Sequence, residues 1–138
     1  MTTSDPVVVR WKKQGLLLEG VTAHGRVDLA SSLDAPGQGP TPMELLALSL
    51  GGCTAMDVIS VLQKMRQPLE ELSVEVRGET AEEHPRRFLS LEIVYHFRGA
   101  LDEKKVQRAV ELSEARYCSV EATLRPAVPI TSRVVIES

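Results

Sequence analysis

Residues 41–66 read TPMELLALSLGGCTAMDVISVLQKMR and predict one long helix. Thr41 is placed to cap the helix, and Pro42 suits the first turn, where no backbone donor is required. Glu44 follows three residues after Thr41, which is the capping-box pattern. The helix is expected to end before Pro68, so its length would be roughly 38 Å.

This helix is apolar on nearly every side and carries few charges before Lys64. A helix of that kind must be surrounded by other structure. A single domain of 138 residues has difficulty wrapping it alone, so the sequence predicts a homodimer in which the partner covers one side. The most apolar part, Leu45 to Met56, is about 12 residues long and too short to span a bilayer. No membrane partner is therefore expected.

Alternating apolar and polar residues predict strands before and after this helix. These strands are expected over residues 7–11, 16–20, 23–29, 72–76, 89–97 and 130–136. Asp102 is placed to cap a second helix, and a short third helix is expected over residues 119–124. The buried face of the second helix is expected to carry Val106, Ala109, Val110, Ser113 and Tyr117. The order of elements predicts an α+β fold in a single domain over residues 1–138.

The composition excludes several classes of function. The net charge is −3, so nothing attracts the chain to nucleic acid, and 4% aromatic residues are too few for a base-stacking surface. Two cysteines do not make a secreted disulfide framework, and the N-terminus lacks the pattern of a signal peptide. A cytoplasmic protein is expected, in a compartment where thiols stay reduced unless they carry out redox chemistry.

Cys53 is the main candidate functional residue. It follows Gly51 and Gly52 within the predicted helix, and the only other cysteine is Cys118. One interpretation is a buried cysteine packed as a small apolar side chain; the other is a two-cysteine redox site. Two glycines inside a helix cost about 1 kcal/mol each relative to alanine. They therefore require tight packing or an accessible backbone near the sulfur.

The surroundings of the two thiols are expected to differ. Cys118 precedes the predicted helix over 119–124, where backbone donors and the helix dipole stabilise a thiolate. Cys53 lies mid-helix and would need an Arg, Lys or His from elsewhere to lower its pKa. Asp57 follows Cys53 by four residues on the same face, where a carboxylate would raise the thiol pKa. The favoured interpretation of Asp57 is a charge paired at the edge of the dimer.

The sequence shows no spacing typical of metal ligands. His24, His84 and His96 lie far from one another and from both cysteines, so no metal and no cofactor are expected. The Gly-Gln-Gly segment at residues 37–39 lacks the Lys and Ser/Thr that a P-loop needs.

Three segments together resemble the OsmC/Ohr family of osmotically induced proteins and organic hydroperoxide resistance proteins. They are GPTPMELL at residues 39–46, GGCTAMD at 51–57 and YCSV at 117–120, in matching order. The resemblance covers nearly the whole chain. It implies an α+β fold in an intertwined homodimer, with two antiparallel sheets around long central helices and a six-stranded sheet per side.

The resemblance also implies an activity connected with the stress response. The family's peroxidases reduce organic hydroperoxides: a helix cysteine attacks the peroxide and becomes a sulfenic acid, which a second cysteine resolves as a disulfide. A dithiol, such as a lipoylated protein, then reduces the disulfide. Carried over to this chain, Cys53 would be the attacking cysteine and Cys118 the resolving one.

Two positions differ from the peroxidases. Their catalytic Glu directly follows the proline at the helix start, where this chain has Met43; Glu44 comes next, about 100° round the helix. They also place an Arg upstream of that Glu, whereas residues 29–34 contain none and Arg26 is the nearest. Arg26 and Glu44 are therefore the candidate substitutes. The chain therefore looks more like the uncharacterised OsmC-like branch than like the peroxidases. The alternative function is binding of a hydrophobic small molecule in an apolar dimer cleft near Cys53.

Overall fold

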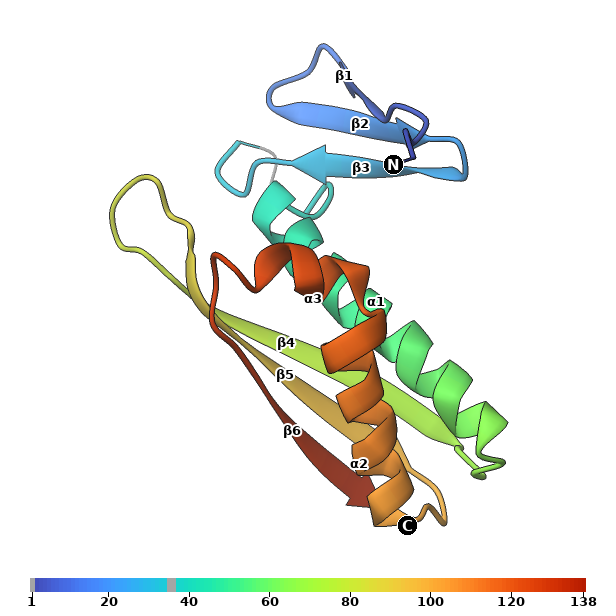
Figure 1. Ribbon diagram of the computed structural model, residues 1–138. Coiled ribbons are helices and arrows are strands. Elements are labelled where there is room, and N and C mark those ends of the chain that lie inside the picture. The colour runs from blue at the N-terminus through green and yellow to red at the C-terminus, as the bar shows by residue number, and fades with distance from the viewer. Residues whose placement is uncertain (1, 35–36) are drawn as a thin grey trace. The chain divides into compact units, whose positions relative to one another are not determined.

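The computed structural model describes residues 2–34 and 37–138 and confirms the α+β fold. Contacts divide the chain into two compact units, the first ending at Leu46 and the second running from Ala47 to Ser138. The single domain over residues 1–138 stays a prediction. The elements in chain order (Figure 1) are β1 (Val8–Trp11), β2 (Leu17–Thr22), β3 (Gly25–Ala30), α1 (Pro42–Lys64), β4 (Glu71–Thr80), β5 (Phe88–Arg98), α2 (Glu103–Leu112), the π-helical turn η1 (Ser113–Tyr117), α3 (Ser119–Leu124) and β6 (Ile130–Glu137).

The first unit contains an antiparallel sheet with the strand order β1-β2-β3. Trp11 lies opposite Leu18 in one pairing, and Leu17 lies opposite Ala30 in the other. Leu17 and Ala30 make up the buried apolar cluster of this unit among the described residues. Every residue of β1 is exposed. The first sheet therefore has a thin core of its own.

Helix α1 begins as the sequence predicts. The N–H of Thr41 donates to Oε1 of Glu44 at 2.9 Å, and the N–H of Glu44 donates to Oγ1 of Thr41 at 3.1 Å, which completes the capping box. At the other end Arg66 has a φ of 55°, and the N–H of Gln67 donates to the carbonyl of Leu62 at 3.0 Å. This left-handed residue ends the helical backbone before Pro68.

The apolar surface of α1 is only partly covered. Its buried residues form one stripe: Leu50, Gly51, Thr54, Val58 and Leu62. Leu48 and Met56 are 62% and 73% exposed. An 18-residue window of α1 has a mean hydropathy of 1.8, so by length and composition α1 is sufficient to cross a membrane. The apolar part of α1 is therefore longer than the stretch from Leu45 to Met56 that the sequence analysis considered too short to span a bilayer. Core helices of soluble proteins have the same length and composition.

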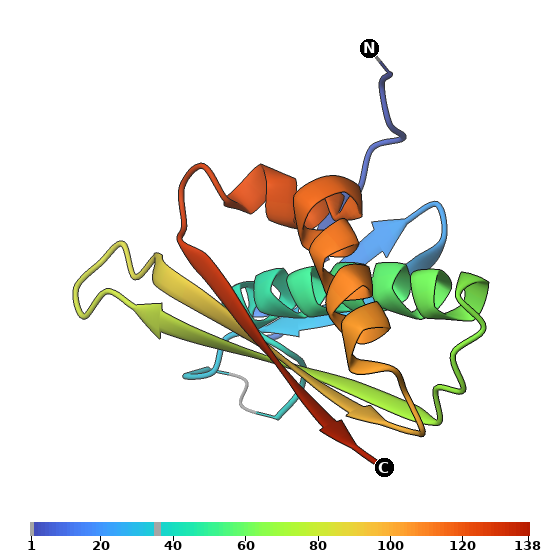
Figure 2. The same ribbon diagram turned by 60° about the horizontal axis from the view of Figure 1, so that its bottom comes forward.

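The second sheet has the order β4-β5-β6. β4 pairs with β5 in antiparallel orientation, but β6 pairs with β5 in parallel. The structure differs here from the expected pair of antiparallel sheets, because α2, η1 and α3 form a crossover that returns the chain in the direction of β5. α1 and α2 lie on the same face of this sheet (Figure 2).

The core of the second unit lies between this face and the two helices. It contains Leu50, Val58 and Leu62 from α1, Leu91, Ile93, Tyr95 and Phe97 from β5, and Val106, Ala109 and Val110 from α2. A Cβ at Gly51 would lie 3.0 Å from Cγ2 of Val76, which is a tight contact, so the close approach of helix and sheet favours glycine there. A Cβ at Gly52 would meet nothing within 4 Å. Tight packing therefore explains the first glycine only.

The segment after β5 leads to the second cysteine. Asp102 caps α2 as predicted, since its Oδ1 accepts from the N–H of Lys104 at 2.9 Å and of Lys105 at 3.3 Å. α2 then passes into the wider turn η1. This turn takes Tyr117 off the expected buried face, so that it is 49% exposed. Cys118 follows directly and caps α3.

Candidate active site

The fold brings both cysteines and one carboxylate together. The Sγ atoms of Cys53 and Cys118 and a carboxylate oxygen of Asp57 all lie within 4.8 Å of one another. Both cysteines are free thiols. We call these three residues the thiol cluster. Its existence depends on tertiary packing in the second unit, because Cys118 is distant from α1 in the sequence.

Helix α1 supplies two members of the thiol cluster. Cys53 and Asp57 lie four residues apart, and side chains at this spacing are neighbours on one helix face. Both residues are half-buried. Cys53 packs against the core of the second unit. Its side chain is therefore held on one side by apolar contacts and remains partly open to a reactant.

Cys118 is held at the junction of η1 and α3. Its N–H donates to the carbonyl of Ser113 at 2.8 Å, and its Sγ accepts from the N–H of Glu121 at 3.3 Å. The residue is only 3% exposed. The pKa of Cys118 is raised to about 12, mainly by burial; the hydrogen bond from the N–H of Glu121 lowers it, while Cys53 and the carboxyl group of Glu121 add to the rise. This corrects the expected thiolate at a helix N-terminus, because desolvation outweighs the backbone donor.

The carboxylate of Asp57 has a specific partner within the second unit. The hydroxyl of Ser113 donates to its Oδ2 at 3.0 Å. The partner that the described chain provides is a hydroxyl group on η1. The pairing of the Asp57 charge at a dimer edge stays a prediction. The helical spacing of Cys53 and Asp57 was visible in the sequence, but the contact with Ser113 was not.

Two further acids near Cys118 were missed by sequence reasoning. Glu121 is 2% exposed; its Oε1 lies 3.4 Å from Nη2 of Arg125, and its Oε2 has no hydrogen-bond partner in the described chain. Glu114 accepts hydrogen bonds from Tyr95 at 3.4 Å and Ser132 at 2.9 Å. Burial is the main cause that raises the pKa of both carboxyl groups. No sequence pattern marked these residues, since neither belongs to a recognisable motif.

The other two predicted site residues belong to the first unit. Arg26 lies on β3, is exposed and pairs with Glu19, with Nη1 and Oε1 3.6 Å apart. Glu44 accepts from the backbone of Thr41 in the capping box. The fold therefore gives each side chain a local partner. Their roles toward Cys53 stay predictions.

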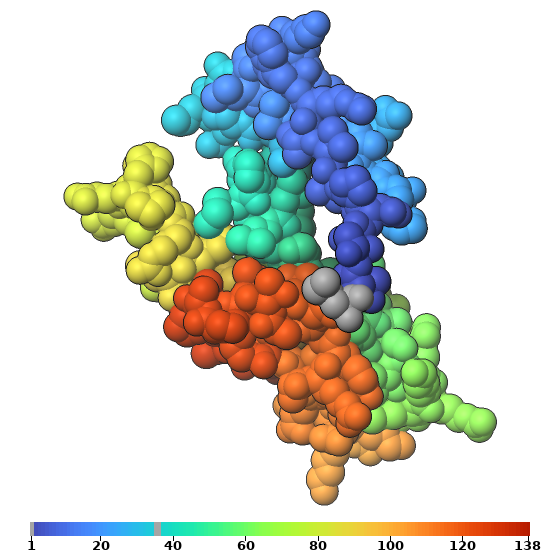
Figure 3. All heavy atoms as spheres, turned by 45° about the horizontal axis from the view of Figure 1, so that its top comes forward, coloured from blue at the N-terminus to red at the C-terminus, as the bar shows by residue number. Residues whose placement is uncertain are grey.

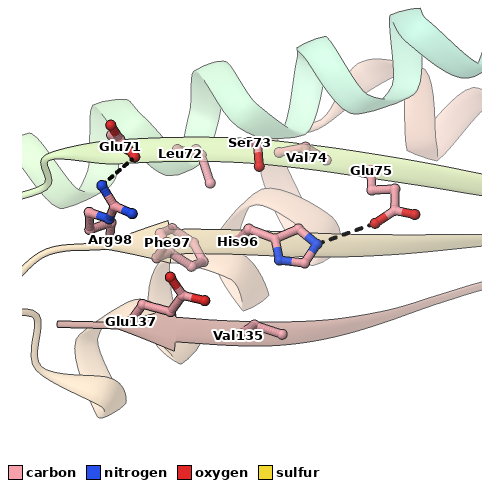
Figure 4. Close-up of a pocket in the computed structure, with 10 residues that line it drawn as sticks. All are labelled: Glu71, Leu72, Ser73, Val74, Glu75, His96, Phe97, Arg98, Val135 and Glu137. Atoms are coloured by element: carbon pink, nitrogen blue, oxygen red, sulfur yellow. Dashed lines mark hydrogen bonds and ion pairs between the residues drawn. The ribbon is translucent and has the colours of Figure 1, made fainter.

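One cavity lies away from the thiol cluster. It has a volume of about 770 Å³ and follows β4, β5 and β6 (Figure 4). Figure 4 shows two charge pairs in its lining: Glu71 lies 3.3 Å from Arg98, and His96 lies 3.3 Å from Glu75. No cysteine lines it. Because Cys53, Asp57 and Cys118 do not line it, this cavity is separate from the thiol cluster.

A second cavity adjoins the thiol cluster at Asp57. Its volume is about 540 Å³. Its lining is mainly apolar and comes from α1 and from the end of the α2–η1 segment: Asp57, Ser60, Val61, Lys64, Met65, Leu112 and Tyr117. The residues of α2, η1 and α3 form one continuous surface, orange to red in Figure 3. A reactant with an apolar body and a polar end would fit such a cavity.

Comparisons with known proteins identify the family. Residues 35–133 match the OsmC-like protein family. The chain is 39% identical over 124 residues to Protein YhfA of Escherichia coli K12, which covers 89% of this chain and 91% of that protein. The crystal structure of a hypothetical protein from Aquifex aeolicus VF5 is 30% identical, covers both chains fully and has a TM-score of 0.84. This chain belongs to the OsmC-like family.

The same fold occurs in hydroperoxide-resistance proteins. The organic hydroperoxide resistance protein OhrB of Bacillus subtilis is 18% identical, with a TM-score of 0.66 and coverage of 94% of this chain and 96% of that one. At this identity the likeness concerns the fold. The OsmC/Ohr family includes stress-response proteins of this kind, and its members are soluble.

Proposed function

We propose that this protein reduces organic hydroperoxides, with Cys53 as the attacking thiol and Cys118 as the resolving thiol. The observation that carries the proposal is the thiol cluster, in which both sulfurs and the Asp57 carboxylate lie within 4.8 Å of one another. To form a disulfide, the two sulfurs would have to approach from this separation to about 2.05 Å. The half-buried Cys53 is the sulfur that a peroxide reaches, because Cys118 is 3% exposed.

The first step oxidises Cys53. The Cys53 thiolate attacks the outer oxygen of the hydroperoxide, the O–O bond breaks, and the sulfur becomes a sulfenic acid while an alkoxide leaves. Asp57 is the group placed to accept the thiol proton and return it to the alkoxide, which leaves as an alcohol. Ser113 orients Asp57 for this transfer through its hydrogen bond to Oδ2. Asp57 thus takes the carboxylate role for which the resemblance suggested Glu44.

The second step forms the disulfide. The sulfur of Cys118 attacks the sulfur of Cys53, the S–O bond breaks, and the hydroxide leaves as water with the proton of Cys118. Both electrons that reduce the peroxide therefore come from the two thiols. A dithiol, of the lipoyl type or similar, returns the pair to the reduced state by thiol–disulfide exchange.

The proposal extends to a homodimer in the cytoplasm. Leu48 and Met56 leave part of α1 exposed, and a second copy of the chain is the occupant that would bury this apolar surface. Reducing conditions in that compartment would keep Cys53 and Cys118 as thiols between turnovers.

Kinetics of matched variants test the proposal. The wild-type protein should consume cumene hydroperoxide with a dithiol reductant, whereas Cys53→Ser should lose this activity. Cys118→Ser should still react once, leaving a sulfenic acid at Cys53 that dimedone traps. Asp57→Asn should slow the first step while Glu111→Gln, an exposed acid on α2, should not. Consumption at the wild-type rate by Cys53→Ser would contradict the mechanism.

The cavity beside Asp57 supports one alternative, a protein that binds a hydrophobic small molecule. Val61, Met65 and Leu112 provide apolar walls, and Met43 is not among its lining residues. Native mass spectrometry of the purified protein would show a bound ligand in that case. Loss of the ligand on Val61→Asp, with no peroxide consumption by the wild type, would favour this alternative.

A further inference from the structure

We propose that the reduced thiol cluster is also a metal site, which binds one Zn²⁺ ion through Cys53, Asp57 and Cys118. The three ligand atoms lie within 4.8 Å of one another. In a tetrahedral zinc site, bonds of about 2.3 Å to sulfur and 2.1 Å to oxygen place neighbouring ligand atoms about 3.4–3.8 Å apart. To bind zinc, the cluster would contract through side-chain rotation until its ligand atoms reach that spacing.

The ligands have an arrangement that protein metal sites use. Cys53 and Asp57 lie at positions i and i+4 of α1, a spacing that places two ligands on one helix face. The third ligand, Cys118, comes from the start of α3. No metal-ligand spacing is visible along the chain, because this third ligand is remote from the other two and because the histidines are not involved.

Neighbouring groups support two of the three ligands. Ser113 donates to Oδ2 of Asp57 at 3.0 Å, which fixes the carboxylate and leaves Oδ1 for a metal. The N–H of Glu121 donates to Sγ of Cys118 at 3.3 Å, which stabilises a coordinating thiolate. Such contacts are the outer shell that orients ligands in metal proteins. The cluster therefore has two ligands already positioned.

The chemistry of the ligands selects the kind of ion. Two thiolates favour zinc and other thiophilic ions over Ca²⁺ and Mg²⁺, which prefer oxygen ligands. Binding displaces the protons of Cys53 and Cys118 into solvent. Three protein ligands leave the fourth position for water.

Metal binding and the redox cycle would exclude each other. Zinc occupies the sulfur of Cys53 and blocks its attack on a peroxide. Conversely, a disulfide between Cys53 and Cys118 removes two ligands and releases the ion. This regulatory link rests on the proposed function, whereas binding of zinc to the reduced protein does not.

Titration of the reduced, metal-free protein with Co²⁺ under anaerobic conditions tests the site. We expect one Co²⁺ per chain, with thiolate-to-cobalt charge-transfer absorption, and displacement by Zn²⁺ but not by Ca²⁺. Cys53→Ser and Cys118→Ser should lose the absorption. Asp57→Asn should weaken binding at least tenfold, and Ser113→Ala should weaken it less, because it frees the carboxylate without removing it. Glu111→Gln should bind as the wild type does.

Two results would overturn the metal site. One is the absence of thiolate-to-cobalt absorption in the reduced wild type; the other is affinity unchanged in Asp57→Asn. Circular dichroism of each variant excludes misfolding as the cause of a loss. If the protein forms the disulfide with a hydroperoxide but binds no metal, only the proposed metal site is contradicted. If it binds the metal but forms no disulfide, the proposed peroxidase activity and the regulatory link are contradicted, whereas the metal site is supported.

Discussion

The two sheets have the same number of strands but very different cores. In the first unit Leu17 and Ala30 are the buried apolar pair, and Trp11 on β1 is 60% exposed. In the second unit Tyr95 and Phe97 on β5 are at most 2% exposed, because α1 and α2 cover one face of that sheet. A small sheet with an uncovered apolar surface is marginally stable in water. The core of the second unit is therefore large enough to stabilise that unit. The first unit needs a further surface to cover its exposed apolar side chains.

The largest expected effect comes from the core of the second unit. Phe97→Ala should reduce the free energy of unfolding by about 3–5 kcal/mol, because it leaves a cavity among fully buried residues. Denaturant unfolding measures this change. Leu33→Ala is the matched control in the first unit, since Leu33 is 95% exposed and should change stability by less than about 0.5 kcal/mol. Equal losses at both positions would remove the distinction between the two cores.

A smaller effect, on the dissociation constant of the proposed homodimer, is expected at the exposed surface of the first sheet. Trp11→Ala should raise the dissociation constant of the proposed homodimer about tenfold, because a large exposed aromatic side chain is a strong interface contact. Sedimentation equilibrium measures this constant. Thr131→Ala, at an exposed position of β6, should leave it unchanged. A monomeric wild-type protein would contradict the proposed homodimer.

The loss of stability on removing one helix cap from each unit allows a direct comparison of the two units. Asp102→Ala should cost about 1 kcal/mol of stability, since it removes the acceptor for two N–H groups of α2. Thr41→Ala should cost less, about 0.5 kcal/mol, because the first turn of α1 that it caps has no fully buried side chain. Thermal unfolding checks both values, and Asp102→Asn, which keeps an acceptor, is the control. A larger loss for Thr41→Ala would show that the first turn of α1 is held more firmly than its exposure indicates.

The smallest effect concerns the partly buried acid Glu114. Because its pKa is raised by burial, its stabilising contribution is complete at low pH and is lost as the pH rises through the folded-state pKa. Glu114→Gln should therefore increase stability at neutral pH, by less than about 1 kcal/mol because solvent screens this partly exposed group. Unfolding curves at acidic and neutral pH should differ less for the variant than for the wild type. A variant that is less stable at neutral pH would show that the charge of Glu114 is needed.

Local signals in the sequence predicted most of the fold. The capping box at Thr41, the cap at Asp102 and the alternation along β5 depend on neighbouring residues, and the structure confirms them. The parallel pairing of β6 with β5 was missed, because strand direction depends on the crossover rather than on periodicity. The exposure of Tyr117 was missed because no pattern marked the turn η1.

The site was harder to predict than the fold. Cys53 and Cys118 were recognised as a pair, and the fold brings them together. Ser113 and Glu121 were not recognised, because their contacts with Asp57 and Cys118 depend on how α1, η1 and α3 pack. The high pKa of Cys118 likewise follows from burial, which a position at a helix N-terminus does not reveal.

Oxidant titration of the reduced protein is the most direct test of whether Cys53 and Cys118 form a redox pair. Cumene hydroperoxide would be added stepwise without a reductant and without oxygen, and intact mass and free thiols would be measured at each step. We expect one equivalent to remove both thiols and about 2 Da per chain, at a rate well above that of free cysteine. Slow oxidation without that stoichiometry would show that Cys53 and Cys118 are not a redox pair.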